Sequence, residues 1–501
     1  MNREPDTPAA ARDQPETLRR GLNAVHVQLI SLGGIIGSCY FLGIGYTVAE
    51  VGPGTVLSLL LGGVIVWLVA NGMGELCVAM PRSGSFVSFA REMVGRPWAA
   101  GVGWSYWFNW CAYVPSEMIA GGIVMHRFFP SVPVIWWAIA FGAVITFINL
   151  SNVKNFGNIE SGLALIKIVA IIMFSVVGVL IWLGVTGHLG GSEAQPHRFL
   201  GLSILTGGKG LAGIFPSGIG AALLTMVMIL VNYQGTEIVA ISAAETKNPE
   251  KNIPVAIRNV AYRIVAIYVI PVIILVSILP YKDAGLSDSV FAHALSVYGM
   301  RWAGWIFSFV VLTAALSCAN SGLYGTIRAL YSLSREGLAP AWLSGLNRSG
   351  VPARATIVTI AVCWAFIPFF IFFQKSSFYT WLLSVSGFAG AVCWISISWC
   401  QLRFRRRIMA RGYSAKDLVY SAPAFPYLSH FAIWVQIGCL VLVALNTKLR
   451  TCLVIGVPAV LIPLLTTAVL VRLGKLPEKP LPAGERSFDE LFPPRRSASD
   501  D

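Results

Sequence analysis

The sequence predicts an all-α integral membrane protein with twelve transmembrane helices, for three reasons. Of the 501 residues, 56% are hydrophobic and only 12% are charged, whereas soluble domains carry roughly 25% charged residues. The mean hydropathy is +0.70, and the apolar residues form runs of about 20, the length that a membrane span needs. Two of these runs are interrupted at corresponding positions in the two halves of the chain, which is typical of transporters built from inverted repeats.

Each predicted span is a long apolar run bounded by polar residues, glycine or proline. Because lipid offers no hydrogen-bond partners, such a run must be helical and satisfy its own backbone. The expected spans are 24–50, 54–79, 98–125, 133–151, 157–185, 218–244, 258–280, 300–332, 354–373, 378–402, 430–447 and 452–473. The first ten would form a transport core over 24–402, with inverted repeats at 24–185 and 218–402, and 430–473 would add two further helices.

Polar segments precede, connect and follow these spans. Residues 1–23 form a polar tail that lacks the apolar stretch of a signal peptide. Residues 81–92 have mixed polarity and predict a short amphipathic helix at the membrane surface. Residues 403–429 are expected to form a basic loop. Residues 474–501 are expected to be a second tail, which is disordered from Leu476 because it is rich in proline, serine and charge.

The basic residues predict that both ends of the chain are cytoplasmic. In that orientation eight of the 37 Lys and Arg residues lie outside, one (Lys167) lies inside a span, and the other 28 lie on cytoplasmic segments, as the positive-inside rule requires. Topology and contact with anionic lipid therefore account for the net charge of +14 better than nucleic-acid binding does. We expect a multi-pass protein of the cytoplasmic (inner) membrane.

The two interrupted runs are the predicted substrate site. The first interruption lies within 29–40 and the second within 231–237. Glycines there free backbone amides and carbonyls in mid-membrane, which is tolerable only where those groups face protein, water or a ligand. The alternative is that the glycines merely allow close helix packing.

An amino acid could be held by these freed groups. Amides at the start of a half-helix attract an anion, so Gly37, Ser38 and Cys39 would bind a carboxylate, while carbonyls near 34–36 and 232–233 would accept from an ammonium. The binding residues expected around the two breaks are Ile36, Gly37, Ser38, Cys39, Tyr233, Gly235 and Thr236.

Lys167 is the residue that we expect to couple transport to protons. Ten residues of helix from Gly157 place it roughly 15 Å deep, close to the centre of the bilayer core. A charged lysine at that depth costs at least about 2.5 kcal/mol, so the side chain should face the protein interior. Burial favours its neutral form, and its ammonium would bind carbonyls of the broken first span. The alternative is a structural lysine that ties the first and fifth spans together without titrating.

Several other polar residues lie within predicted spans. Glu237 directly follows the second break and would orient the unwound backbone, titrate or contact the substrate ammonium; alternatively, it only accepts hydrogen bonds from freed amides. Glu75 is expected to pair with a loop arginine such as Arg82. Asn109 and Asn320 would either line the substrate path or bridge helices.

Several motifs resemble the bacterial amino acid transporter (AAT) family of the amino acid–polyamine–organocation (APC) superfamily, over about residues 20–412. The resemblance implies the LeuT-like five-plus-five inverted repeat, with helices one and six broken and two helices added. It also implies amino acid uptake coupled to protons by alternating access. The matching motifs are 233–237 (YQGTE), 243–249 (AAETKNP), 74–76 (GEL), 80–86 (MPRSGSF) and 316–322 (LSCANSG).

The resemblance also implies roles for individual residues. Proton-coupled members have a lysine at the position of Lys167 and an aromatic lid over the substrate at the position of Tyr233. Similar members have an acid at Glu117, which suggests substrate shaping or a proton relay, although a buried acid bonded to a neighbouring helix fits as well. Where the family commonly has Gly-Thr-Gly-Leu-Phe, this chain has Gly-Ser-Cys-Tyr-Phe at 37–41. Cys39 keeps the backbone amide but narrows the space, so we expect an altered substrate range.

These observations predict an amino acid permease that acts by proton symport, uses the proton gradient and needs no cofactor. The expected partners are an amino acid, protons and membrane lipid. One alternative is an exchanger of amino acids or amines without net proton coupling, and another is a non-transporting amino acid sensor. An enzyme is disfavoured, because the sequence has no H-E-x-x-H or G-x-S-x-G motif and its nine cysteines lack metal-site spacing.

Overall fold

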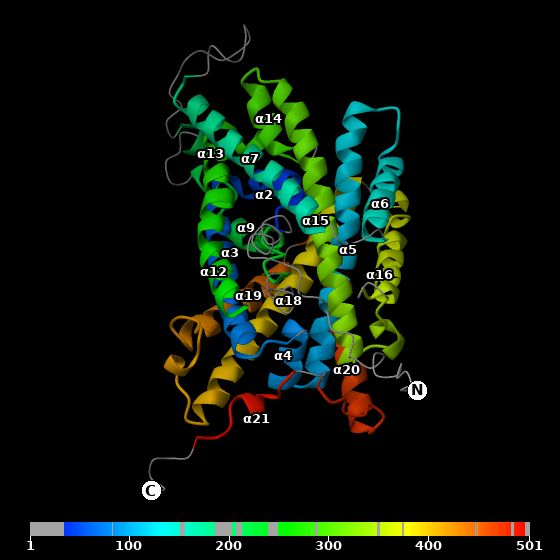
Figure 1. The fold of residues 1–501 in the computed structure, drawn as a ribbon. Helices are drawn as coiled ribbons and strands as arrows, with labels where there is room; N and C mark the ends of the chain where they lie inside the picture. Colours follow the sequence, from blue (N-terminus) through cyan, green and yellow to red (C-terminus); the bar gives the residue numbers. More distant parts are fainter. Residues whose placement is uncertain are drawn as a thin grey trace, which may run out of the picture.

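The protein is a bundle of long helices (Figure 1). The computed structural model describes residues 35–495, except 83, 151–155, 186–202, 207–212, 239–248, 286–288, 348–350, 373–374, 446, 448 and 482–484. These residues form helices and connecting turns, and no strand is found among them. Residues 24–34 of the first predicted span and residues 239–248 after the second break lie outside the described part. The expected carbonyl at 34 and all of the motif 243–249 except Pro249 therefore lie there.

The helices follow the chain in this order. They are η1 (Cys39–Gly43), α2 (Ile44–Val51), η2 (Gly52–Gly54), α3 (Thr55–Ala79), α4 (Ser85–Met93), α5 (Arg96–Phe128), α6 (Val134–Leu150), α7 (Phe156–Trp182), α8 (Ser203–Thr206), α9 (Ile219–Leu224), α10 (Met226–Val231), α12 (Pro249–Arg263), η7 (Ile264–Val269), α13 (Ile270–Ile278), η8 (Tyr281–Asp283), α14 (Val290–Val297), α15 (Trp302–Arg335), η9 (Ala341–Ser344), α16 (Ala353–Phe366), α17 (Phe369–Phe372), α18 (Lys375–Met409), η10 (Ala415–Asp417), α19 (Tyr427–Leu445), α20 (Thr451–Arg472) and α21 (Phe488–Leu491).

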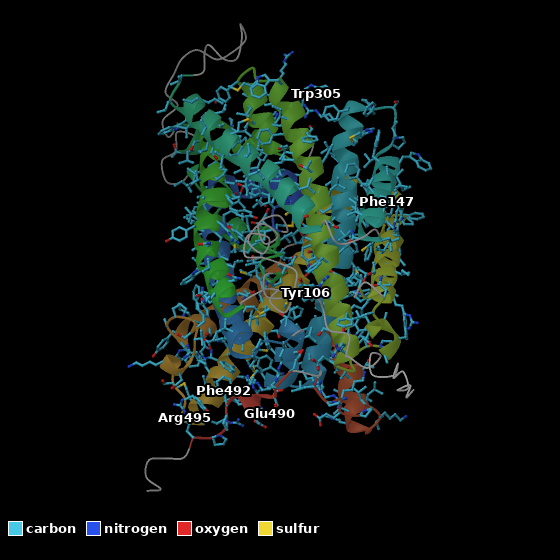
Figure 2. The ribbon with its side chains drawn as sticks, in the orientation of Figure 1. Tyr106, Phe147, Trp305, Glu490, Phe492 and Arg495 are labelled. Carbon is cyan, nitrogen blue, oxygen red and sulfur yellow. The ribbon has the colours of Figure 1, made fainter. Side chains whose placement is uncertain are left out.

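Seven helical stretches of the described chain are long and apolar enough to cross a membrane. They are 39–79, 162–182, 254–278, 302–335, 378–409, 427–445 and 452–472, and α6 and α16 are shorter apolar helices. Large apolar side chains such as Phe147 of α6 and Trp305 of α15 are exposed, whereas Tyr106 lies inside the bundle (Figure 2). This distribution suits a multi-pass membrane protein, and the count of twelve spans stays a prediction.

Helix α5 lies at the centre of the bundle and packs against α15, α18, α20 and α6. The contact with α15 is close because Gly322 has no side chain: a Cβ there would lie 2.1 Å from the Trp110 ring. Small residues at such contacts are how membrane helices approach one another. The same helix carries Tyr106, Tyr113 and Glu117, so it brings them to the middle of the protein.

Two helices extend beyond the predicted spans. The segment predicted to begin at 258 begins at Pro249. Proline suits the first turn of a helix, because the amide that it lacks would have no partner there. A second proline, Pro254, lies inside α12. Arg403–Arg407, expected in a loop, form the last turns of α18. The short amphipathic helix expected within 81–92 is α4, which buries Phe86 and Phe89.

The prediction that the tail is disordered from Leu476 is wrong for its described residues. Helix α21 is closed by a capping box between Ser487 and Glu490, and it lies beneath the bundle at the end where α4 lies (Figure 1). Phe488 and Phe492 are buried, with their ring centroids 6.1 and 5.5 Å from that of Phe404. The polar composition of the tail was misleading, because a few apolar side chains that pack on α18 are enough to hold this segment in place.

Candidate functional site

The first break is present at the start of the described chain. Ile36 and Gly37 are not helical, and regular structure resumes at Ser38. The Gly37 carbonyl accepts from the Tyr40 amide at 3.3 Å, while the Ile36 carbonyl is free for a partner from another helix. Both residues are buried, so their polar groups must be satisfied by the protein.

Lys167 satisfies the Ile36 carbonyl. Its side chain is 0% exposed, and its Nζ donates to Ile36 O at 2.9 Å and to Ser317 Oγ at 2.8 Å. The lysine on α7 therefore connects the broken first helix to α15. This is the contact expected from the sequence, and its role in coupling stays a prediction.

The freed amide of Ser38 already has a carboxylate partner. Ser38 N lies 3.1 Å from both Oε1 and Oε2 of Glu117, which is fully buried on α5. We expected this amide to be open to a substrate carboxylate, but an amide at the start of a half-helix attracts any nearby anion. Gly37 makes the approach possible, since a Cβ there would lie 2.5 Å from Glu117 Oε1.

Cys39 fills space beside this pair. The Tyr113 hydroxyl donates to Cys39 Sγ at 3.1 Å, and the Ser38 and Tyr379 hydroxyls are 3.1 Å apart. A glycine at 39 would leave the Tyr113 hydroxyl without this acceptor. The Cys39 side chain is buried, and its effect on the space for substrate stays a prediction.

The second break covers residues 232–237, which form successive turns instead of a helix. Gly235 has a φ of +102°, a conformation that favours glycine. Glu237 turns back on its own break and accepts from the Gly235 amide at 3.1 and 3.2 Å. It also accepts from the Tyr106 hydroxyl at 3.3 Å and from Trp394 Nε1 at 3.2 Å. These contacts are compatible with orientation of the unwound backbone and with the alternative that Glu237 only accepts from freed amides, so the role of Glu237 stays a prediction.

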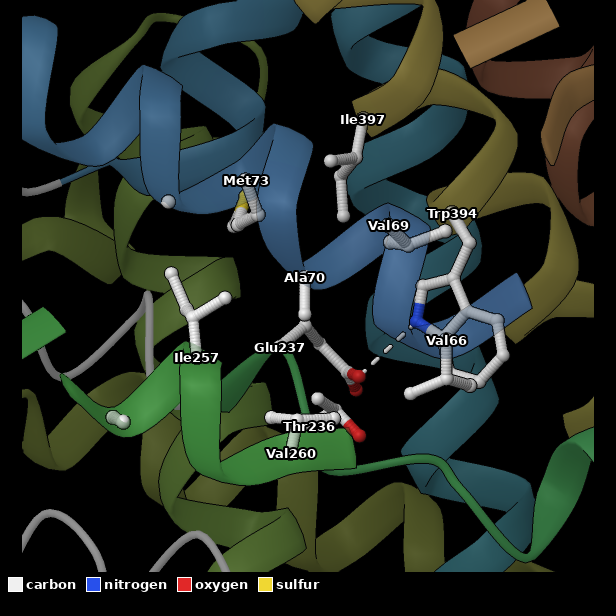
Figure 3. A pocket seen from close by; sticks show the side chains of 12 residues that line it. Val66, Val69, Ala70, Met73, Thr236, Glu237, Ile257, Val260, Trp394 and Ile397 are labelled. Carbon is white, nitrogen blue, oxygen red and sulfur yellow. Dashed lines mark hydrogen bonds between the residues drawn. The ribbon is translucent and has the colours of Figure 1, made fainter. Parts of the chain in front are cut away.

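Two cavities adjoin the breaks. The larger, of about 430 Å³, has the Glu237 carboxylate on its wall among apolar side chains, including those of Ala70 and Met73 (Figure 3). The smaller, of about 300 Å³, is lined by Ile36, Tyr233 and Thr236, among others. Val66, Thr236 and Val260 line both. The two breaks therefore line adjoining cavities.

The remaining predicted site residues bridge helices. The Tyr233 hydroxyl donates to Leu59 O at 2.8 Å, and Asn109 Oδ1 accepts from Ser386 Oγ at 2.5 Å. Asn320 Oδ1 accepts from Asn149 Nδ2 at 3.0 Å. Neither asparagine lines the two cavities described, so both match the bridging alternative, whereas Tyr233 both bridges and lines a cavity.

Glu75 pairs with a different arginine from the one expected. Its Oε1 accepts from Arg405 Nε at 2.7 Å, while Arg82 pairs with Glu92 at 3.2 Å. Sequence proximity favoured Arg82, but the extension of α18 brings Arg405 to the end of α3.

Sequence reasoning missed Glu160. This residue is 0% exposed and accepts from the Ser317 hydroxyl, the same hydroxyl that accepts from Lys167. A usable signal was present: positions 160 and 167 are seven apart, so they share one face of a helix. Tyr113 and Tyr106, which contact Cys39 and Glu237, carried no signal among the many aromatic residues.

The chain is similar to known permeases over most of its length. The amino acid permease family matches residues 26–474. The amino-acid permease RocC of Bacillus subtilis is 39% identical over 82% of this chain and 85% of its own length. The lysine-specific permease LysP of Escherichia coli is 36% identical over 85% of this chain and 86% of its own. The gamma-aminobutyric acid permease of B. subtilis is 36% identical over 86% of this chain and 89% of its own length. These relatives are named as permeases and not as enzymes, and the chain belongs to the amino acid permease family of the APC superfamily.

Proposed function

We propose that this protein imports an amino acid across the cytoplasmic membrane by proton symport, with alternating access around the two breaks. The observation that carries the proposal is the contact of the buried Lys167 ammonium with Ile36 O in the first break. The distribution of Lys and Arg supports cytoplasmic ends for the chain.

The lysine can link protonation to the shape of the site. A hydrogen bond from a charged donor contributes about 1.5–3 kcal/mol, more than a neutral one. When Lys167 loses its proton, its bonds to Ile36 O and Ser317 Oγ weaken, and the broken segment is freed to move. Proton loss therefore favours a different arrangement of the first helix, which is what coupling requires.

Substrate binding adds a second link to protons. The Ser38 amide that would hold the substrate carboxylate is occupied by Glu117. Two carboxylates cannot share one amide unless one of them is protonated or moves away. A substrate that enters the cavity beside Ile36 and Thr236 would therefore displace Glu117 and favour its protonated form.

The substrate class is an amino acid, by analogy with the relatives. Their names include a lysine-specific permease and a gamma-aminobutyric acid permease, so ligands that differ in charge and carboxylate position are handled within this family. The acidic groups at the breaks, Glu117 and Glu237, suit a substrate that brings an amino group.

The test is uptake of radiolabelled amino acids into proteoliposomes with an imposed inward proton gradient. We expect wild-type protein to accumulate its substrate, and Lys167→Ala to lose gradient-driven uptake while it elutes as the same folded species on size-exclusion chromatography. Lys475→Ala, which removes an exposed lysine, is the matched control. Unchanged uptake and pH dependence in Lys167→Ala would exclude the coupling role. Transport that needs substrate on both sides and ignores the gradient would identify an exchanger.

A further inference from the structure

We propose that Glu160 is the proton acceptor for Lys167, and that the Ser317 hydroxyl carries the proton between them. The inference rests on the proposed coupling role of Lys167 and adds the route by which its proton leaves.

The three side chains form one line of hydrogen bonds. Lys167 Nζ donates to Ser317 Oγ at 2.8 Å, and Ser317 Oγ donates in turn to Glu160 Oε1. Glu160 and Lys167 are both on α7, two turns and about 10 Å apart along the helix axis, and Ser317 projects from α15 between them. All three are 0% exposed, so a proton that moves along this line does not meet bulk water on the way.

The two carboxylate oxygens of Glu160 differ among the described residues, since Oε1 is bonded to Ser317 and Oε2 is not bonded. Its Oε2 atom is buried and has no hydrogen-bond partner within the described part of the chain. A buried carboxylate oxygen without a partner is costly in the charged form, and protonation of the acid removes that charge. The arrangement thus leaves Glu160 able to accept a proton.

The other groups around this line set its polarity. Asn320 and Ser321 of α15 also face the Glu160 carboxylate. Lys167 is faced by Glu117, Cys39 and Cys318 as well as by Glu160. Lys167 is thus the one cation in a set whose acids are Glu160 and Glu117, among the described residues that face these two groups. A proton that leaves Lys167 has two acids to reach, and Ser317 connects it to Glu160.

The transfer balances without any further reactant. One N–H bond of the Lys167 ammonium breaks as its proton forms an O–H bond on Ser317 Oγ, and the original Ser317 O–H bond breaks as that proton forms an O–H bond on Glu160 Oε1. Lysine becomes neutral, the serine is regenerated and the glutamate becomes a neutral acid, so no electron is exchanged. Glu160 is the nearer of the two to the start of α7 at Phe156. In the proposed orientation that end is cytoplasmic, so the proton moves inward.

The test separates net symport from exchange. A symporter must release its proton inside to complete net uptake, but exchange of external for internal substrate can proceed without that release. We expect Glu160→Gln to lower proton-driven net uptake by about 100-fold and exchange by far less. Ser317→Ala should shift the same ratio, and Ser317→Thr, which keeps a hydroxyl, should restore it. Ser308→Ala, at another buried serine of α15, is the matched control.

Each outcome decides the proposal. If Glu160→Gln leaves net uptake unchanged, or lowers uptake and exchange equally, Glu160 is a structural counter-ion and the proposal is wrong. If Glu160→Gln does not fold, the uptake-to-exchange ratio of Ser317→Ala against Ser317→Thr decides in the same way. Failure of the underlying symport function is recognised separately, because wild-type protein would then ignore the proton gradient and Lys167→Ala would behave like wild type.

Discussion

Two buried acid–base groups in this bundle are built differently. At the end of α3, Glu75 accepts from Arg405 Nε at 2.7 Å and Gln401 Nε2 at 3.2 Å through Oε1, and from the Ala422 amide at 2.6 Å through Oε2. In the middle of the bundle, Glu160 is bonded through Oε1, and its Oε2 has no hydrogen-bond partner among the described residues. Lys167 donates to a carbonyl of the broken first helix and to the Ser317 hydroxyl.

The difference separates a structural ion pair from groups that can gain or lose a proton. A buried ion pair is tolerable when every lone pair and proton is satisfied, and then removal of either partner is strongly destabilising. Glu75 and Arg405 meet that condition and tie α3, α18 and the segment before α19 together. Among the described residues, Glu160 does not meet it, because its Oε2 has no hydrogen-bond partner. Lys167 and Glu117 contact the broken segment at Ile36 and Ser38. We therefore expect substitutions at the first group to affect folding and substitutions at the second to affect transport.

The largest effect is expected from Glu75→Gln. Breaking a buried ion pair by removing one partner costs about 3–5 kcal/mol, so this variant should lose most of its folded protein or melt at a much lower temperature in detergent. Thermal unfolding followed by tryptophan fluorescence measures this effect. A Glu75→Leu/Arg405→Leu double variant, which removes both charges, should recover part of the loss. If Glu75→Gln has a normal melting temperature but impaired transport, Glu75 acts in transport, and the two groups do not differ in the proposed way.

A smaller effect on stability is expected from Glu117→Gln. The change weakens the charge-assisted bond from the Ser38 amide, and such bonds contribute about 1.5–3 kcal/mol. In this variant the substrate carboxylate no longer competes with a charged Glu117 for the Ser38 amide. Substrate preference or the pH profile of uptake should therefore change more than the yield of protein. Uptake over a series of external pH values, with the melting temperature of the same preparation, makes the measurement. Loss of folded protein at unchanged preference would place Glu117 with Glu75 as a structural acid.

The smallest effect is expected from Cys39→Gly. This change restores the glycine that the family commonly has in the first break and removes the acceptor of the Tyr113 hydroxyl. Glycine in a helical turn costs about 1 kcal/mol relative to alanine, so the protein should fold, while the added space should admit larger amino acids. A competition assay, in which unlabelled amino acids of increasing size inhibit labelled uptake, compares the two proteins. An identical inhibition pattern would mean that residue 39 does not limit substrate size.

Much of the fold follows from local pattern. Helices α3, α5, α15 and α20 lie close to predicted spans, because an apolar run in lipid has to be helical. The breaks at Ile36–Gly37 and at 232–237 lie where glycines interrupt such runs. Burial of Lys167 follows in the same way, since a lysine at that depth has to face protein.

The partners of the buried charges could not be predicted. Ser38 meets Glu117 across 79 residues, Lys167 meets Ser317 across 150, and Arg405 meets Glu75 across 330. Helical periodicity says which face a residue occupies and nothing about which helix lies opposite. The order of the tail has the same origin, because Phe488 and Phe492 look like isolated apolar residues until the end of α18 covers them.

By itself, the sequence determined that the chain is helical and apolar, where two helices are interrupted, and that Lys167 is buried. These properties depend on neighbours in the chain and on the solvent, and both can be read from composition and spacing. Only the tertiary structure decided that Glu117 occupies the freed amide, that Glu160 shares a serine with Lys167, and that Glu75 binds Arg405. A hydrogen bond needs two groups within about 3 Å, and the packing of distant helices alone brings them that close.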